Sequence, residues 1–403
     1  MSDSIVIIGG GHAAAGLCAG LAEAGLGARV HLVCAEAELP YQRPPLSKAF
    51  LKNPEEALQS HRAEAWYADA GITLHRADPA LAIERAAQRV SLQSGAVLEY
   101  ERLVLATGAV ARRLPQLGAG LANVALLRSA ADARRLREQL AAAASVTVLG
   151  GGFIGLEIAA SARALGKAVT LLESAPRLLE RSVSAEIAEH VLQTHRGAGI
   201  DLRLAVAAEG FEVEGGRLAA ISVDGRREPV ELLVMGIGAA PDTALAEAAG
   251  LECDNGIVVD ACLRSSDPAI LAVGDCANFP QTPGGRRLRL ESVQNAGDQA
   301  RTAVATLLGR EEPYRALPWF WSEQGGLRLQ MAGLMPAGGE IHRRPGATPA
   351  SFSLFHYSGA RLACVESVNA PMDHLMSRKL LEAGKSPAPD VVCDPKTALK
   401  ALL

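Results

Sequence analysis

The stretch IVIIGGGHAAAG at residues 5–16 contains a short apolar run, three glycines and the start of an alanine-rich segment. This pattern is typical of a strand–turn–helix that binds a dinucleotide. The first glycine permits a tight bend, the second lets the backbone approach a pyrophosphate, and a third small residue lets the helix pack on the sheet. The pyrophosphate then lies at the positive end of the helix dipole. One such match is weak evidence, because glycine turns also occur for steric reasons alone.

A second stretch, VLGGGFIGLEIA at 148–159, repeats the pattern and adds Glu157 inside the helix. In both copies a second strand follows, and an acid lies at or just beyond its end. These acids are Glu36 and Glu173, which come 36 − 9 = 27 and 173 − 150 = 23 residues after the first glycine of their turns. Both spacings are close to that of a carboxylate that holds a ribose diol. The sequence therefore predicts two dinucleotide-binding units.

The duplication extends beyond the two turns. Ala-Gly-Ile recurs at 70–72 and 198–200, followed each time by short alternating strands and a last apolar strand closed by glycine and alanine. We therefore expect an α/β fold with two Rossmann-like βαβ units, each with an inserted meander. The first copy is longer between its acid and Ala-Gly-Ile, and the surplus contains PYQRPPLSKAFL (40–51). Such an insertion favours a specialised role, with a surface loop as the alternative.

The composition limits the class of protein. With 403 residues, 49% hydrophobic and 21% charged, we expect an ordinary soluble α/β protein of two or three domains. The net charge of −4 argues against general nucleic-acid binding. The longest uncharged stretch, 140–156, contains the second glycine turn, so we expect no membrane span. The seven cysteines are scattered without metal-site spacing, which favours reduced thiols, no metal site and a cytoplasmic location.

The rest of the chain contains fewer signals. Residues 251–280 predict strands and end near Gly274-Asp275, where an acid can cap a helix or accept hydrogen bonds from ribityl hydroxyls. Residues 291–309 predict a helix, and the aromatic run WFWSEQ at 319–324 marks a boundary. Beyond it, we expect a separate C-terminal α+β domain.

Eight motifs, in order along the whole chain, resemble those of the putidaredoxin/rubredoxin reductase family, the FAD-dependent, NADH-oxidising ferredoxin reductases that supply oxygenases. They are RPPLSK (43–48), LATGA (105–109), GGGFIGLE (150–157), GIG (236–238), NGIVVD (255–260), AVGDCA (272–277), ESVQNA (291–296) and WFWSEQ (319–324). The resemblance implies a fold similar to glutathione reductase, with FAD on the first turn and NADH on the second. The implied domains are 1–108 and 239–315 for FAD, 109–238 for NADH, and 316–403 for the C-terminal α+β domain.

The resemblance also implies site residues. Three positions depart from the family pattern: Ala14 replaces the third glycine, Ala35 leaves the first ribose contact to Glu36 alone, and Val293 stands where tryptophan is frequent. The implied FAD contacts are Gly9, Gly11, Ala13, Ala14, Glu36, Arg43, Lys48, Ala80, Arg128, Asp275 and Val293. The implied NADH contacts are Gly150, Gly152, Ile154, Gly155, Glu173 and Gly238.

Lys48 and Glu157 are the predicted catalytic residues. We expect them to form a half-buried ion pair at the flavin, where hydride transfer from nicotinamide needs no general acid or base. An ordinary interdomain salt bridge is the alternative. Electrons are expected to pass to a small acidic ferredoxin, most simply of the two-iron type, which needs a local basic face on the reductase. The candidates for that face are Arg286, Arg287, Arg289, Arg301, Arg378 and Lys379, with Trp321 near it.

Three other functions use a similar scaffold. A flavin disulfide reductase needs a cysteine facing the flavin, and the sequence has none between Cys34 and Cys253, which nearly excludes that activity. Rubredoxin is an alternative acceptor. An NADH-sensing flavoprotein similar to apoptosis-inducing factor is the non-enzymatic alternative.

Overall fold

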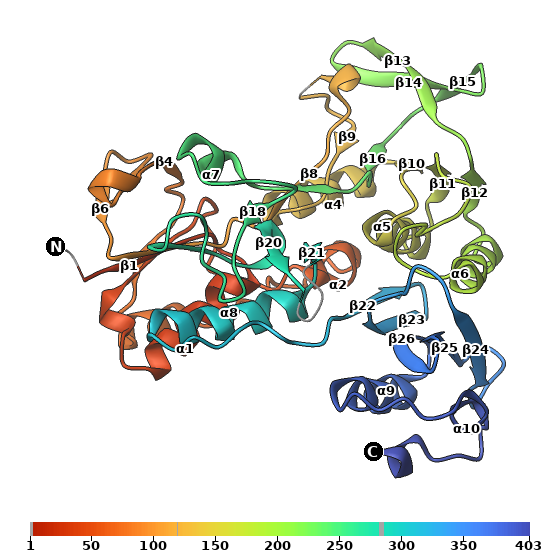
Figure 1. The fold of residues 1–403 in the computed structure, drawn as a ribbon. Coiled ribbons are helices and arrows are strands. Elements are labelled where there is room, and N and C mark those ends of the chain that lie inside the picture. The colour runs from red at the N-terminus through yellow and green to blue at the C-terminus, as the bar shows by residue number, and fades with distance from the viewer. Residues whose placement is uncertain (1–2, 119, 282–285) are drawn as a thin grey trace. The chain divides into compact units, whose positions relative to one another are not determined.

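The computed structural model describes residues 3–118, 120–281 and 286–403 (Figure 1). Its backbone contacts divide the chain into two compact units. Unit 1 comprises Met1–Arg43, Ala57–Val110 and Ala239–Ala316, and unit 2 comprises Pro44–Glu56, Ala111–Gly238 and Leu317–Leu403. The four cofactor and C-terminal domains expected from the sequence stay a prediction, since these units follow from contacts alone.

Unit 1 is built on a five-stranded sheet in the order β19-β7-β1-β2-β3, with every neighbouring pair parallel. All four residues of β1 are buried, which is typical of a strand covered on both faces of a parallel sheet. The strands are β1 (Ile5–Ile8), β2 (Val30–Val33), β3 (Thr73–His75), β7 (Arg102–Leu105) and β19 (Ile270–Ala272).

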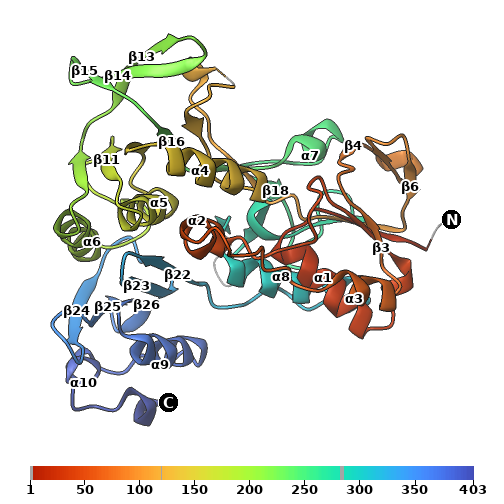
Figure 2. The same cartoon turned by 180° about the vertical axis from the view of Figure 1, so that it is seen from behind.

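Helices α1 (His12–Glu23) and α8 (Val293–Leu307) lie side by side against this sheet (Figures 1 and 2). Two glycines of α1 permit the close approach, because a Cβ at Gly16 would lie 3.0 Å from the Cβ of Ala300. At Gly20 it would lie 2.9 Å from Val304 Cγ2. The other elements of unit 1 are β4 (Ala80–Glu84), β5 (Arg89–Leu92), β6 (Val97–Glu99), β8 (Ala109–Ala111), β17 (Ala239–Pro241), β18 (Ile257–Val258), β20 (Ala277–Pro280), β21 (Arg287–Leu288), α3 (Glu64–Asp69), α7 (Ala244–Ala248) and the 3-10 turns η1 (Gly27–Arg29), η3 (Arg85–Ala87) and η5 (Gly274–Cys276).

Unit 2 repeats the arrangement in a second five-stranded parallel sheet, β12-β11-β10-β16-β9. Strands β12, β11, β10 and β16 correspond in order to β3, β2, β1 and β7, and each unit adds a three-stranded antiparallel meander. The predicted duplicated α/β fold is therefore confirmed. The strands are β9 (Val124–Ala125), β10 (Ser145–Leu149), β11 (Ala168–Glu173), β12 (Asp201–Leu204), β16 (Leu233–Met235) and, in the meander, β13 (Ala208–Glu214), β14 (Arg217–Val223) and β15 (Arg226–Pro229).

Four helices and the insertion complete this part of unit 2. Helix α5 packs on β10 and β11 and also contacts the insertion. The insertion forms a 3-10 turn, η2, and a short helix, α2, which pack on α4. The bounds are α2 (Ala49–Lys52), α4 (Ala130–Ala142), α5 (Phe153–Ala164), α6 (Ala185–Gly197), η2 (Pro44–Ser47) and η4 (Pro115–Leu117).

The last segment of unit 2 is an antiparallel sheet, β22-β23-β26-β25-β24, with α9 packed on β23 and β26. This arrangement is the α+β structure expected for the C-terminal region. Among the described residues, no helix is both long and apolar enough to cross a membrane. The bounds are β22 (Trp319–Gln324), β23 (Leu327–Gly333), β24 (Glu340–Pro345), β25 (Phe352–Ser358), β26 (Arg361–Val368), α9 (Pro371–Glu382), α10 (Pro389–Cys393) and η6 (Leu399–Leu402).

Candidate active site

The helices that follow the two glycine turns begin differently from α4, α6 and α8, as does α9, which has no side-chain cap at Ala370. Among the described residues, no side chain caps α1 at Gly11 or α5 at Gly152. By contrast, Ser129, Ser184 and Ser292 cap α4, α6 and α8 with their side chains. The N-cap glycines of α1 and α5 thus offer no side-chain acceptor to the first turn of their helices, which suits a bound phosphate.

The first glycine of each turn is required by close packing. Gly9 has φ +133°, and a Cβ there would lie 2.1 Å from the carbonyl oxygen of Ala106. Gly150 has φ +102°, and a Cβ there would lie 2.5 Å from the carbonyl oxygen of Gly236. Both turns are therefore pressed against the neighbouring strand end, where an L side chain does not fit.

The second glycine of each turn faces open space. No described atom lies within 4 Å of a Cβ placed on Gly11 or Gly152, so the backbone is accessible to a ligand there. The third position packs inward: a Cβ on Gly155 would lie 2.1 Å from the carbonyl oxygen of Gly150. Its counterpart Ala14 is fully buried, so this turn does accommodate a methyl group. Both turns fit a dinucleotide pyrophosphate.

The acids that follow the second strands are held in different ways. Glu173 ends β11 and accepts hydrogen bonds from the backbone N–H of Gly151 at 2.5 Å and of Ala175 at 2.7 Å. Its carboxylate thus lies against the second glycine turn. Glu36 accepts hydrogen bonds from the Tyr41 hydroxyl at 2.6 Å and from Arg43 at 2.8 Å. Sequence reasoning missed Tyr41, although it lies inside the quoted insertion.

Three further predicted FAD contacts lie in unit 1. Asp275 is in η5, next to Gly274, where a Cβ would lie 3.4 Å from the Cβ of Ala13. This places η5 beside the start of α1. Val293 is the first residue of α8, and Ala80 is the first residue of β4.

Three other predicted contacts lie in unit 2. Ile154, on the first turn of α5, is 47% exposed, so a ligand can reach it. Gly238 has φ +96°, and its carbonyl accepts a hydrogen bond from the N–H of Arg112 at 2.9 Å. Arg128 directly precedes the cap of α4 and donates its N–H to Asp132 at 3.1 Å. The cofactor roles of these residues stay predictions.

Lys48 and Glu157 form an ion pair within unit 2. Lys48 Nζ lies 2.7 Å from Glu157 Oε2 and also donates to the carbonyl of Pro44 at 3.2 Å. The lysine side chain is 20% exposed and the glutamate side chain 4%. Removing either partner would leave the other charge uncompensated in a largely dry environment.

Two serines complete the environment of Glu157. Ser47 donates its hydroxyl to Oε2 at 2.5 Å, and Ser322 donates to Oε1 at 2.6 Å. Ser161 in turn donates to the carbonyl of Ser47 at 2.7 Å. Sequence reasoning missed both serines as site residues, although each lies in a motif quoted for the resemblance.

A cavity of about 290 Å³ opens onto this ion pair in unit 2. Its walls come from α2, α5 and the turn between β22 and β23. Because Lys48 and Glu157 belong to its lining, small molecules can approach the pair from outside. The lining residues are Lys48, Lys52, Glu157, Ala160, Ser161, Ala164, Glu323, Gln324, Gly325, Gly326, Leu327 and Arg328.

The cysteines show no sign of redox or metal chemistry. All seven are free, and burial raises the pKa of the Cys34 thiol to about 12 and that of the Cys276 thiol in the same direction. Protonated, buried thiols are poor nucleophiles. In the part of the chain that the structure describes, no group of His, Cys, Asp and Glu side chains is arranged to hold a metal ion.

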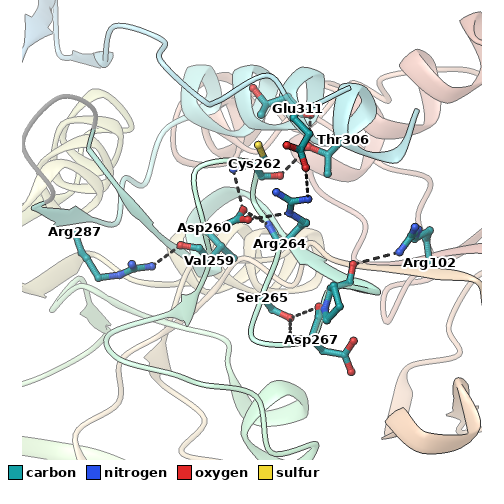
Figure 3. Close-up of polar contacts among 12 residues, drawn as sticks. Arg102, Val259, Asp260, Cys262, Arg264, Ser265, Asp267, Arg287, Thr306 and Glu311 are labelled. Atoms are coloured by element: carbon teal, nitrogen blue, oxygen red, sulfur yellow. Dashed lines mark hydrogen bonds and ion pairs between the residues drawn. The ribbon is translucent and has the colours of Figure 1, made fainter. Parts of the chain in front are cut away.

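Two of the predicted docking arginines make local hydrogen bonds or ion pairs. Arg287 donates to the backbone carbonyl of Val259 at 2.6 Å (Figure 3). It also donates to the carbonyl of Asn278 at 2.5 Å. Arg289 is only 11% exposed and pairs with Glu291 at 2.5 Å. Arg289 is thus less available than Arg287, which is exposed, and the docking role of both stays a prediction.

The remaining docking candidates differ in exposure. Arg286 and Lys379 are exposed, and Arg301 is 75% exposed beside Asp298. Arg378 lies over the ring of Trp319, 4.3 Å from its centroid, and that ring stacks on Trp321 at 5.5 Å.

Two family models together match nearly the whole chain. Residues 3–300 match the pyridine nucleotide-disulphide oxidoreductases, and residues 319–403 match the reductase C-terminal domain. The chain belongs to the pyridine nucleotide-disulphide oxidoreductase family.

Individual members of the family align over the full chain. Rhodocoxin reductase of Rhodococcus erythropolis is 42% identical, over 98% of this chain and 93% of that protein. The ferredoxin–NAD(+) reductase component of the anthranilate 1,2-dioxygenase system of Burkholderia cepacia is 40% identical, over 100% of both. The crystal structure of the ferredoxin reductase for the CYP199A2 system of Rhodopseudomonas palustris superposes with a TM-score of 0.95, at 41% identity and 99% coverage of both chains.

Family membership explains why the chain has two dinucleotide turns. Members use FAD and NADH, and this protein is an FAD- and NADH-dependent oxidoreductase of the ferredoxin reductase type. Both glycine turns fit such cofactors sterically and electrostatically. The chain has no cysteine between Cys34 and Cys253, where the sequence analysis looked for the flavin-facing cysteine of a disulfide reductase.

Proposed function

We propose that this protein passes electrons from NADH, through FAD, to a small acidic two-iron ferredoxin that supplies an oxygenase. The Lys48–Glu157 ion pair carries the proposal, because it joins the insertion unique to the first βαβ unit with the helix of the second turn. The ferredoxin acceptor is supported by the names of the full-length relatives from Burkholderia cepacia and Rhodopseudomonas palustris.

We assign FAD to the first turn and NADH to the second. Gly9, Gly11, Ala13, Ala14 and Glu36 would hold the FAD diphosphate and ribose, with Arg43, Lys48, Ala80, Arg128, Asp275 and Val293 as further contacts. Gly150, Gly152, Gly155 and Glu173 would hold the NADH diphosphate and ribose, with Ile154 and Gly238 beside the nicotinamide half. The uncapped helix ends and the open second glycines support both assignments.

FAD, when bound, supplies the conversion of a two-electron hydride into single electrons. The protein supplies position and charge. Lys48 would favour negative charge on the reduced ring, while Glu157 would accept a hydrogen bond from the nicotinamide carboxamide. With hydride as the transferred species, the site needs no general acid or base.

We place the ferredoxin contact on α9 and, separately, near Arg301. On α9, Lys379 is exposed, and the apolar Met372 and Leu375 are 64% and 41% exposed. Exposed apolar side chains beside a positive charge are typical of a transient protein interface. Trp321, which stacks on Trp319, supplies an aromatic group in the same unit.

We place the protein in the cytoplasm. Its seven cysteines are all unpaired, which is usual where thiols are kept reduced.

Reversing the charge of basic residues at the proposed contacts tests whether an acidic ferredoxin is the electron acceptor. Arg301→Glu and Lys379→Glu should each lower the rate of ferredoxin reduction at an ionic strength of about 0.01 M, and much less at about 0.15 M, where charges are screened. Ferricyanide reduction by NADH should change little, since that acceptor needs no protein docking. Arg226→Glu, on the exposed edge of β15, is the matched control for net charge.

Four results would contradict the proposal. Equal loss of ferredoxin and ferricyanide reduction in both variants, or ferredoxin turnover that ignores salt, would exclude the basic contacts. Faster reduction of rubredoxin than of any two-iron ferredoxin would exclude a ferredoxin as the proposed electron acceptor. A long-lived NADH-reduced complex with slow turnover would favour the alternative function of an NADH-sensing flavoprotein.

A further inference from the structure

A chain of hydrogen bonds leads from Glu157 into the interior of unit 2. Ser322 donates to Glu157 Oε1 at 2.6 Å, and Gln324 Nε2 donates to the Ser322 hydroxyl at 3.1 Å. Gln324 Oε1 in turn lies 3.0 Å from His195 Nε2. The chain therefore joins α5, β22 and α6, which are far apart in the sequence.

The bonds in this chain all run in one direction. Because the amide oxygen of Gln324 is an acceptor, the hydrogen between it and His195 must be on the histidine Nε2. Every donor then points toward the carboxylate of Glu157. Aligned bonds of this kind polarise one another and favour negative charge at the accepting end.

Burial shields the chain from competing water. His195 is 2% exposed, Gln324 1% and Ser322 0%. Burial also lowers the pKa of His195, which keeps its ring neutral with one nitrogen as donor. In a dry environment, losing one bond leaves the next group unsatisfied.

The chain also fixes the plane of the carboxylate. Oε2 of Glu157 is bonded by Ser47 and Lys48, and Oε1 by Ser322. Because both oxygens accept hydrogen bonds, rotation about the Cγ–Cδ bond of Glu157 would break at least one of these hydrogen bonds. Without Ser322, only one edge of the carboxylate would be held.

We propose that Ser322, Gln324 and His195 are positioning residues for hydride transfer, acting in series to orient and polarise Glu157. This proposal rests on the proposed function of the Lys48–Glu157 pair. It gives the C-terminal sheet a part in the reductive half-reaction, since β22 supplies two of the three links.

The test measures flavin reduction in the FAD-loaded protein by stopped flow over a range of NADH concentrations. Ser322→Ala should lower the limiting rate about tenfold, the loss expected for one hydrogen bond to a charged group. His195→Leu and Gln324→Leu should lower it less. The NADH concentration at half-maximal rate should change little, because the chain orients a group and does not bind the coenzyme.

Conservative variants and a matched control separate positioning from a general structural effect. Ser322→Thr keeps the hydroxyl and His195→Gln keeps a donor, so both should recover most of the rate. Gln330→Leu is the control: Gln330 is a buried glutamine on β23, paired in register with Trp321, and among the described residues its Oε1 has no partner. This control should keep the wild-type rate.

A second measurement does not depend on turnover. Ring ¹⁵N NMR of the loaded protein should show the hydrogen of His195 on Nε2, and Gln324→Leu should shift that signal. In a Glu157→Gln background, Ser322→Ala should cause no further loss of rate, because the group it positions has lost its charge.

The possible failures can be told apart. A wild-type flavin that NADH does not reduce would overturn the proposed function. A reducible wild type whose Ser322→Ala and Gln324→Leu variants match Gln330→Leu would overturn the positioning chain alone. Finding the ring hydrogen of His195 on Nδ1 would also overturn the positioning chain. Full additivity of the rate losses caused by Ser322→Ala and Glu157→Gln would overturn it as well.

Discussion

Glu157 and Glu173 are both glutamates of the second βαβ unit, yet they differ in what holds them. Three side chains from two other segments surround Glu157: Ser47 and Lys48 from the insertion, and Ser322 from β22. Glu173 is held by backbone N–H groups of its own neighbourhood. The position of the Glu157 carboxylate therefore depends on other segments of unit 2, whereas the position of the Glu173 carboxylate depends on its own turn.

The Lys48–Glu157 pair should show strong coupling in a double-mutant cycle. Lys48→Ala and Glu157→Ala should each slow flavin reduction by about 10- to 100-fold, while leaving FAD bound. Each single change strands the partner charge, so the double variant should lose less than the two single losses combined. Stopped-flow reduction rates of the four proteins check this, and strict additivity would show that the side chains do not interact.

Glu173 should set the preference for NADH over NADPH. Its carboxylate would accept hydrogen bonds from the adenosine ribose diol and repel a 2′-phosphate. Arg177 donates to the carbonyls of Val183 and Glu180 at 2.8 and 2.5 Å and keeps its positive charge, so we expect a preference for NADH and not absolute exclusion of NADPH.

Glu173→Ala should therefore reduce the ratio of kcat/KM for NADH over NADPH by at least about tenfold. Steady-state kinetics with both coenzymes give this ratio. Comparable efficiency of the wild type with the two coenzymes would show that Glu173 does not lie at the ribose.

At the scale of elements, the insertion that carries Lys48 is tied to α4 by one arginine. The guanidinium of Arg137 lies 4.0 Å from the ring centroid of Phe50 and donates to the carbonyls of Pro54 at 2.7 Å and Asn53 at 3.4 Å. A short segment with one turn of helix has little stability of its own, so such contacts determine its order.

Arg137→Ala should loosen residues 44–56 and lower the rate of flavin reduction indirectly, through Lys48. Backbone amides of this segment should exchange hydrogen faster, while those of β10 and β11 should not. Glu138→Ala, an exposed change on the same helix, is the control. Unchanged exchange in 44–56 would show that Arg137 does not hold the insertion in place.

At the scale of the whole molecule, histidines make the fold sensitive to acid. Burial is the largest cause that lowers the pKa of each of six histidines in the folded state, and that of His374 falls to about 4. Between a pH of about 6.5, the ordinary histidine pKa, and these lowered values, the unfolded chain binds protons that the folded chain does not. The six are His31, His61, His75, His190, His195 and His374.

The free energy of unfolding should therefore fall as the pH drops below about 6.5 and continue to fall toward about 4. Denaturant titrations at a series of pH values measure this slope. His374→Phe should make the slope shallower, because among the described residues neither ring nitrogen of His374 has a hydrogen-bond partner. A free energy of unfolding that rises on acidification would contradict the lowered pKa values of these histidines.

The sequence by itself predicted the two βαβ units, and the family resemblance implied the two cofactors and the Lys48–Glu157 pair. The signals for the βαβ units are short-range: glycine spacing, strand hydrophobicity and an acid after the second strand all act within one unit of about thirty residues. The motifs RPPLSK and WFWSEQ pointed to the regions that matter but not to the contacts within them.

Only the tertiary structure decided which groups meet Glu157. Ser47 and Ser322 lie 110 and 165 residues from it in sequence, and Gln324 reaches His195 across 129 residues. A hydrogen bond between such segments depends on how the strands and helices pack, which leaves no local pattern to read. The same holds for the hydrogen bonds of Arg287: its partners are backbone carbonyls, which every residue has, so no sequence pattern marks them.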